Sequence, residues 1–145
     1  GQASCLLAPL VGRQAGLLLA DTTRYAEKQL FVAQCGVDPA RIAAIGGIEA
    51  RGVDLWAERE HVLDLLTEAG KNLLAADRVQ VLLFGCLSFL GLAHPLSERL
   101  GVPVVDPAVA PVALAECLVR QGLKTSRKAY PAPPLRKRTW QGGQL

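Results

Sequence analysis

The sequence predicts an α/β domain, in which a doubly wound, Rossmann-like parallel sheet carries helices on both faces. Short apolar runs of strand length alternate with longer segments of helical period, which is typical of βαβ units. Residues 79–84 are apolar at nearly every position, as in a strand covered on both faces. The length of 145 residues, half of them hydrophobic, suits one compact domain that needs no disulfide or metal to hold its core.

Each expected strand is a short apolar run that ends in polar or glycine residues. The strands are expected at residues 16–20, 41–45, 79–84 and 102–106. Pro103 favours an edge position, or the first position, for the last of these strands. The helices are expected at residues 3–11, 23–34, from 54 to about 76, from 94 to 101 and from 107 to 121.

Local signals support the helical segments. The longest one has an apolar stripe at spacings of three, four and seven residues. The stripe comprises Leu55, Val62, Leu63, Leu66, Leu73 and Leu74. Pro95 suits a first helical position, and Pro111 is tolerable only if a helix begins close to it. Gly36, Gly101 and Gly122 are expected where helices end.

Composition excludes several classes of protein. The longest uncharged apolar stretch, residues 79–93, is shorter than the roughly 20 residues of a membrane span, and the start lacks the basic front of a signal peptide. A reducing cytoplasm is therefore the expected location. The cysteines form no C-x-x-C pair and lie far from His61 and His94, so no metal site is expected. Cys5, Cys35 and Cys117 are expected to be small buried hydrophobic residues.

Charge is distributed unevenly along the chain. Residues 1–116 hold nine basic and thirteen acidic side chains, whereas residues 117–145 hold seven basic side chains and no acid. We therefore expect a folded lobe at residues 1–123 and a basic, proline-containing tail at 124–145 that is solvated and poorly ordered. Nucleic-acid binding through Arg136, Lys137 and Arg138 is a weaker alternative.

Functional residues are expected after the strands, because ligands of open parallel sheets bind outside the carboxyl ends of the strands. Those places are residues 21–23, 46–49, 85–88 and 106–107. Cys86 is the strongest candidate, since backbone N–H groups at a strand-to-helix junction favour a thiolate. Gly85 allows another backbone or a substrate to approach. A purely structural role for Cys86 stays open on these grounds.

Other motifs argue against common activities. The glycines from Gly47 to Gly52 lack the Lys-Ser/Thr of a phosphate-binding loop, and there is no G-x-G-x-x-G or G-x-S-x-G. Asp106 follows its strand directly, where it either binds a substrate or caps the next helix. His61 and His94 are expected at the surface.

At residues 81–92 the sequence VLLFGCLSFLGL is similar to the second cysteine motif of the Asp/Glu/hydantoin racemase superfamily. Residues 101–106 (GVPVVD) and 122–127 (GLKTSR) look like the hydantoin and allantoin racemase branch. Gly12 and Arg13 before a strand, with Thr22 and Thr23 after it, fit the same family. The resemblance extends from about residue 1 to residue 134.

This resemblance implies one lobe of a pseudo-symmetric two-lobe enzyme that racemises or epimerises a carbon next to a carbonyl. One thiolate removes the proton and an opposite thiol returns one, without a cofactor. Cys86 matches the second of these cysteines. A substrate carbonyl or carboxylate is then expected to accept hydrogen bonds from Thr22 and Thr23, and the substrate is expected to contact Gly85, Leu87 and Asp106.

Two departures from the family pattern shape the expectation. Cys5 and Cys35 match neither the motif nor the place of the first cysteine, so the chain looks like a C-terminal fragment whose helix at 107–121 packs toward the missing lobe. Leu87, Ser88 and Phe89 are bulkier than usual for the motif. A one-cysteine decarboxylase and a non-catalytic binding module stay open as alternatives. Homo-oligomers are expected, and membrane binding is not.

Overall fold

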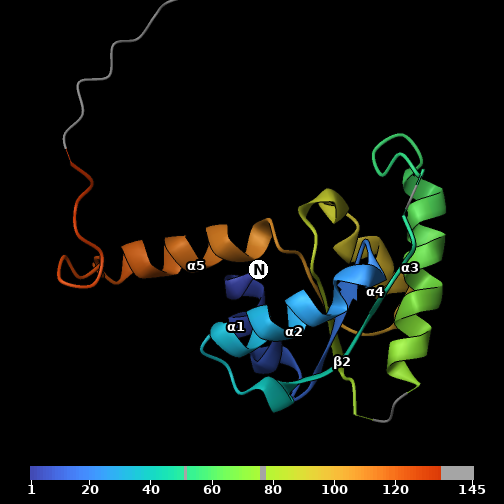
Figure 1. Ribbon diagram of the computed structural model, residues 1–145, viewed down its shortest axis with the longest axis horizontal. Helices are drawn as coiled ribbons and strands as arrows, with labels where there is room; N and C mark the ends of the chain where they lie inside the picture. The colour runs from blue at the N-terminus through green and yellow to red at the C-terminus, as the bar shows by residue number, and fades with distance from the viewer. Residues whose placement is uncertain (51, 76–77, 135–145) are drawn as a thin grey trace, which may run out of the picture.

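A computed structural model describes residues 1–50, 52–75 and 78–134 of the chain. These residues form a four-stranded sheet in the order β2-β1-β3-β4 (Figure 1). All three strand pairs are parallel; Leu18 of β1, for example, pairs with both Gly46 of β2 and Phe84 of β3. The predicted parallel α/β fold is confirmed.

The elements follow the predicted alternation. The strands are β1 (Ala15–Leu19), β2 (Ile42–Gly47), β3 (Val81–Phe84) and β4 (Val104–Val105). The α-helices are α1 (Gln2–Val11), α2 (Tyr25–Gln34), α3 (Arg59–Leu74), α4 (Ala93–Leu100) and α5 (Val109–Arg120). Short 3-10 helices η1 (Thr22–Arg24), η2 (Pro39–Arg41) and η3 (Leu87–Phe89) lie in the connections.

Helices cover both faces of the sheet, because successive side chains of a strand point to opposite faces. Leu18, Leu82 and Phe84 point to the face covered by α3 and α4. Leu17 and Leu83 point to the other face, which α1 and α2 cover. The four residues of β3 are all buried, which confirms that this strand is covered on both sides.

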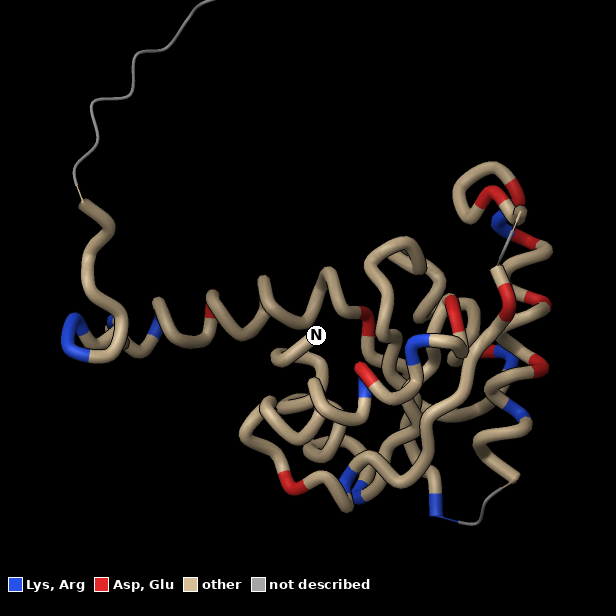
Figure 2. The backbone as a smooth tube through the Cα atoms, in the orientation of Figure 1, with Lys and Arg blue, Asp and Glu red and all other residues tan. Residues whose placement is uncertain are grey.

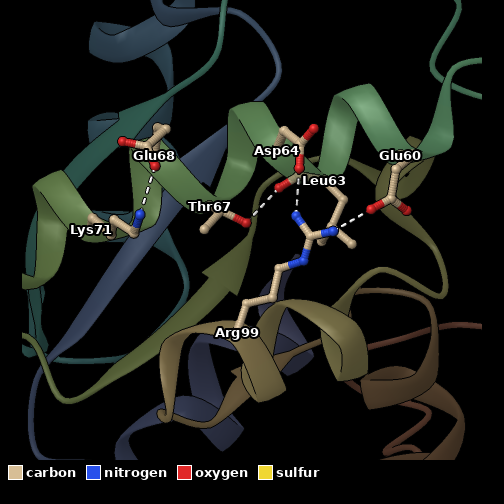
Figure 3. A network of polar contacts seen from close by, with 7 residues as sticks. All are labelled: Glu60, Leu63, Asp64, Thr67, Glu68, Lys71 and Arg99. Carbon is tan, nitrogen blue, oxygen red and sulfur yellow. Dashed lines mark hydrogen bonds and ion pairs between the residues drawn. The ribbon is translucent and has the colours of Figure 1, made fainter.

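Polar contacts join α3 to α4 (Figure 3). The guanidinium of Arg99 in α4 lies 2.6 Å from a carboxylate oxygen of Asp64 and also bonds Glu60, both in α3. Within α3, the Thr67 hydroxyl donates to the Leu63 carbonyl at 2.7 Å. These ion pairs are largely exposed and therefore contribute little net stability, but they fix how α4 lies on α3.

The predicted glycine stops are confirmed. Gly36, Gly101 and Gly122 all have positive φ angles, between 68° and 76°. L-residues with a side chain rarely adopt this conformation, so glycine ends each of the three helices at little cost. Pro111 lies in the first turn of α5, as the prediction required.

Most element boundaries lie within two residues of the prediction, and the long helix and the last strand differ most. The long helix begins at Arg59 rather than Asp54, because the Asp54 carboxylate accepts backbone hydrogen bonds from Trp56 and Ala57 and holds a separate turn. These two bonds also lower the pKa of Asp54. The last strand is shorter than predicted and covers only Val104–Val105, at the edge of the sheet.

Helix α5 and the segment after it project from the body of the molecule (Figure 1). Only Ala110 of α5 is buried, and the helix packs on α1. Residues 124–134 are exposed and contain one turn, in which the Tyr130 amide donates to the Ser126 carbonyl at 2.8 Å. Arg136, Lys137 and Arg138 lie outside the described residues, so the nucleic-acid alternative and the order of the tail stay predictions.

Two further expectations concern exposure. Cys117 is exposed on α5, so the prediction that it is buried is wrong, because little of α5 packs against the body. Cys5 and Cys35 are buried, as expected.

None of the helices formed by the described residues is long and apolar enough to cross a membrane.

Candidate active site at the carboxyl edge of the sheet

The predicted candidate residues gather along one edge of the sheet. The parallel order places the end of β1 between those of β2 and β3, and the end of β4 beside that of β3. Thr22 and Thr23 follow β1, Gly85 and Cys86 follow β3, and Asp106 follows β4. All these residues therefore lie along the carboxyl edge, although Asp106 and the threonines are on opposite sides of Cys86.

Cys86 lies half-buried at the N-cap of η3, in extended backbone geometry. Its side chain packs on the apolar cluster beneath α3 and α4. Phe89, at the end of η3, is fully buried and meets Phe84 in an edge-to-face contact with ring centroids 5.1 Å apart. The Phe89 ring therefore anchors the short loop that presents Cys86.

Two charged side chains hold this loop from opposite sides. From α3, the Arg59 guanidinium donates to the carbonyl oxygens of Ser88 and Leu90. From the end of β4, Asp106 accepts a hydrogen bond from the Gly91 amide at 2.9 Å. Backbone groups of residues 88–91 are therefore fixed by Arg59 and Asp106.

Asp106 is 8% exposed, and both its carboxylate oxygens accept backbone hydrogen bonds. The second bond comes from Ala108 at 2.8 Å, just before α5. The Asp106 carboxylate is therefore held by the amides of the η3 loop and of the turn before α5. Its role in binding a substrate stays a prediction. Asp106 also borders an apolar groove of about 710 Å³ between α1, α4 and α5.

The loop after β1 is a compact polar turn. The Thr22 hydroxyl donates to Glu49, which follows β2, and the Thr23 hydroxyl donates to Asp21 at 2.5 Å. The Asp21 carboxylate also accepts from the Thr23 amide at 2.9 Å, so it caps η1. Both threonine hydroxyl protons are therefore directed at carboxylates, while their oxygens keep lone pairs that accept hydrogen bonds.

Arg24 is a residue of this edge that the sequence analysis did not single out. Its guanidinium forms a bidentate pair with Glu27, with contacts of 2.7 and 2.8 Å. The hydrogen bond and charge of Glu27 raise the pKa of Arg24, and the nearby charges of Asp21 and Cys86 raise it further. Arg24 thus keeps a positive charge within electrostatic reach of the Cys86 thiol. The sequence signal that could have identified Arg24 is its position directly after Thr22 and Thr23.

Gly85 and Leu87 border a second, smaller cavity. A Cβ at Gly85 would lie 2.7 Å from a methyl of Leu19 and 3.3 Å from the Leu18 carbonyl oxygen, so the close approach is made by β1 itself. Leu87 is 63% exposed. With Lys28 and Phe31 of α2 it helps to line a cavity of about 260 Å³.

One buried thiol, Cys5, also helps to line the cavity that Gly85 and Leu87 border. Cys5 of α1 and Cys35 after α2 belong to the cluster on the face covered by α1 and α2. Burial, with the charge and hydrogen bond of Cys35, raises the pKa of Cys5 to about 12. Cys117 is exposed on α5. Among the described residues, no group of three His, Cys, Asp or Glu side chains is placed to hold a metal ion.

Curated relatives match part of the chain. It is 39% identical over 84 residues to a hydantoin racemase of Paenarthrobacter aurescens, and 37% identical over 82 residues to a hydantoin racemase of a Pseudomonas species. These matches cover 57% and 56% of this chain. Over this region the chain is similar in sequence to hydantoin racemases. It spans only about a third of their length, 36% and 33%. No family model matches the chain.

Solved structures extend the likeness to nearly the whole chain. An allantoin racemase from Klebsiella pneumoniae matches 96% of this chain with a TM-score of 0.83 at 23% identity, which shows a shared fold. An allantoin racemase from Pseudomonas fluorescens matches 95% with a TM-score of 0.72 at 26% identity. This chain covers 57% and 59% of those two chains. The resemblance to the hydantoin and allantoin racemases is confirmed.

Proposed function

We propose that this chain contributes one catalytic thiol, Cys86, to a racemase or epimerase that acts on a carbon next to a carbonyl without a cofactor. The observation that carries the proposal is the placement of Cys86 on a fixed loop at the carboxyl edge, in a chain related to hydantoin racemases. A hydantoin- or allantoin-like ring, or an amino acid, is the substrate class.

In the proposed step, the Cys86 thiolate removes the proton from the carbon beside the carbonyl. A new S–H bond forms, and the electron pair of the broken C–H bond delocalises onto the carbonyl oxygen as an enolate. Arg24 places a positive charge within electrostatic reach of the Cys86 side chain. A fixed charge placed where negative charge develops lowers the barrier without reorganisation.

Thr22 and Thr23 are proposed to contact the substrate from the neighbouring loop. Their hydroxyl protons are donated to Glu49 and Asp21, so in this arrangement their oxygens accept hydrogen bonds rather than donate them. An N–H group of a hydantoin ring suits such acceptors. This refines the expectation from sequence, which assigned the hydroxyls as donors to a carbonyl or carboxylate.

Inversion of the carbon needs a second group on the opposite face of the planar enolate. Among the described residues, no other cysteine lies on a loop that follows a strand: Cys5 of α1 lines the neighbouring cavity but is 1% exposed, Cys35 is buried after α2, and Cys117 is exposed on α5. We propose that the second group comes from a further lobe, in line with the fraction of the relatives that this chain spans. The exposed side of α5 would pack toward that lobe.

Deuterium exchange tests the proposal. The protein that contains this chain together with the proposed further lobe is incubated in D₂O with one enantiomer of a 5-substituted hydantoin, and deuterium at the ring carbon and loss of optical activity are followed together. Cys86→Ala should lower both rates by at least about a thousandfold, since a cooperating acid/base group is lost. Cys117→Ala is the matched control and should behave as the unsubstituted protein. Full activity of Cys86→Ala would overturn the assignment.

A one-cysteine decarboxylase is the second candidate, favoured because Cys86 is the one cysteine of the described residues that lies on a loop after a strand. Loss of carbon dioxide from a substituted malonate leaves the same kind of enolate, which one thiol can protonate. Release of carbon dioxide that depends on Cys86, without deuterium exchange into hydantoins, would favour this candidate over the racemase. Absence of both reactions would favour a non-catalytic binding module.

A further inference from the structure

The opposite edge of the sheet carries a cluster of arginines that the proposed function does not use. Arg13 precedes β1, Arg41 precedes β2, and Arg78 precedes β3. Because β2, β1 and β3 are neighbours in the parallel sheet, their amino ends meet and bring the three side chains to one place. Together they line a cavity of about 430 Å³. In Figure 2, blue Lys and Arg positions of the backbone gather at the lower end of the body.

Hydrogen bonds connect the three segments that carry these arginines. The Arg13 amide donates to the side-chain oxygen of Gln80 at 2.9 Å, and the Gln80 amide donates to the Gln14 carbonyl at 2.9 Å. Arg41 reaches across to donate to the Arg13 carbonyl at 3.3 Å. The backbone around the cavity is therefore held in place before any ligand arrives.

The charges of this cavity are not balanced by the described residues. None of the described carboxylates forms an ion pair with Arg13, Arg41 or Arg78. Asp38 is the one acidic residue in the described lining, and one of its oxygens accepts the Ala40 amide at 2.9 Å. In the described lining, three guanidinium groups stand against one carboxylate, an excess of two positive charges, although residues 1–116 as a whole are net negative.

We propose that this cavity is a binding site for a small molecule that bears a phosphate dianion. The excess charge matches a dianion, and the planar guanidinium presents paired N–H donors that fit phosphate oxygens. The volume lies within the range of small-ligand pockets. We therefore assign the site to a phosphorylated metabolite of that size rather than to a nucleic-acid backbone, and it lies at the end of the sheet opposite to Cys86.

Binding of inorganic phosphate, measured by calorimetry and by amide shifts in NMR spectra, tests the proposal. Titrations are made at constant ionic strength, with chloride as the replacing anion. Saturable binding should shift the amides of residues 13, 14, 41 and 80. Arg41→Gln and Arg78→Gln should each weaken it about tenfold, since each removes a charge-assisted contact. Arg120→Gln on α5 is the matched control and should leave it unchanged.

Adenosine monophosphate and a double-stranded oligonucleotide serve as further probes of the source of the phosphate. Binding of inorganic phosphate or of the monophosphate that is lost in both arginine variants supports the proposal. Tighter binding of the oligonucleotide to the same arginines would overturn the assignment to small molecules. Absence of saturable binding, or equal binding in Arg41→Gln, Arg78→Gln and the unsubstituted protein, would overturn the site itself.

Discussion

The two thiol environments of this fold differ more than their common residue type suggests. Cys86 follows β3 directly and lies half-buried on a loop at the carboxyl edge, with the Arg24 charge nearby. Cys5 is 1% exposed beside Cys35, on the face covered by α1 and α2. Burial beside a second thiol raises the pKa of Cys5 to about 12, so it stays neutral in the physiological range.

The comparison teaches that position relative to the strand ends decides what a cysteine does in this fold. Side chains within the sheet layers meet helices and lose water, whereas the residue after a strand meets a loop and open space. A thiol within the layers, such as that of Cys5, packs against its neighbours. A thiol on the loop after a strand, such as that of Cys86, is accessible to a substrate. Alkylation, alkaline unfolding and substitutions near the loop can each test this difference between the environments of Cys5 and Cys86.

Alkylation rates should separate the two environments most strongly. At pH 8 a thiol with a pKa of about 12 has roughly a thousandfold less thiolate than an ordinary cysteine. Iodoacetamide should therefore modify Cys5 at least about a thousandfold more slowly than Cys86, with exposed Cys117 as the internal reference. Peptide mapping of each site over time measures the rates. Equal rates at Cys86 and Cys35 would argue for a structural role of Cys86.

Alkaline pH should destabilise the protein through Cys5. The folded state keeps this thiol protonated up to about pH 12, whereas an unfolded chain releases the proton near pH 9. Between these values the folded state binds more protons, so its stability is present below pH 9 and falls as pH rises, by up to about 1.4 kcal/mol per pH unit.

Urea unfolding of the unsubstituted protein and of Cys5→Ala at a series of pH values measures this effect. The stability difference between the two proteins should shift steadily in favour of Cys5→Ala from pH 9 upward. A difference that does not change with pH would show that Cys5 titrates normally in the folded state.

Local sequence signals predicted most of the fold. The continuous apolar run before Cys86 indicated a buried strand, and the glycines after three helices indicated their ends, because both signals act within a few residues. The location of Thr22, Cys86 and Asp106 at the carboxyl edge also followed from their places at the ends of expected parallel strands. Such inferences need no knowledge of long-range contacts.

Contacts between distant residues were not predictable in the same way. Arg59 meets the backbone of Ser88 and Leu90 across 29 and 31 residues, and nothing near Arg59 in the sequence marks it as a partner of that loop. The Thr22 contact with Glu49 spans 27 residues. The exposure of Cys117 depends on how little of α5 packs on α1, which the periodicity of that helix does not reveal.

Removing the Arg59 contacts should slow the proposed reaction without weakening substrate binding. Arg59→Gln frees the backbone of residues 88–90, and small misplacements of a catalytic group cost about 10- to 100-fold in rate. We expect kcat to fall by this factor and KM to change little. Arg99→Gln, which removes contacts to α3 but none to the loop, is the matched control. A rise in KM with constant kcat would instead place Arg59 at the substrate.

The exposed side of α5 should make this chain self-associate. Val109, Val112 and Val119 recur at spacings of three and seven residues, share one side of the helix, and are 58%, 59% and 75% exposed. Apolar stripes of this kind commonly mark interaction surfaces. We expect residues 1–145 to form dimers or larger homo-oligomers, and not to racemise hydantoins alone if the second acid/base group lies in another lobe.

Val112→Lys together with Val119→Lys should weaken this association at least about tenfold, because two charges are then placed in the apolar contact. Gln121→Lys adds a charge at the end of the same helix without removing an apolar side chain, and should have less effect. Sedimentation velocity over a range of concentrations measures the change. A monomer that racemises at the rate of longer relatives would show that the chain holds both acid/base groups, because a buried α5 surface and a second lobe would then be unnecessary.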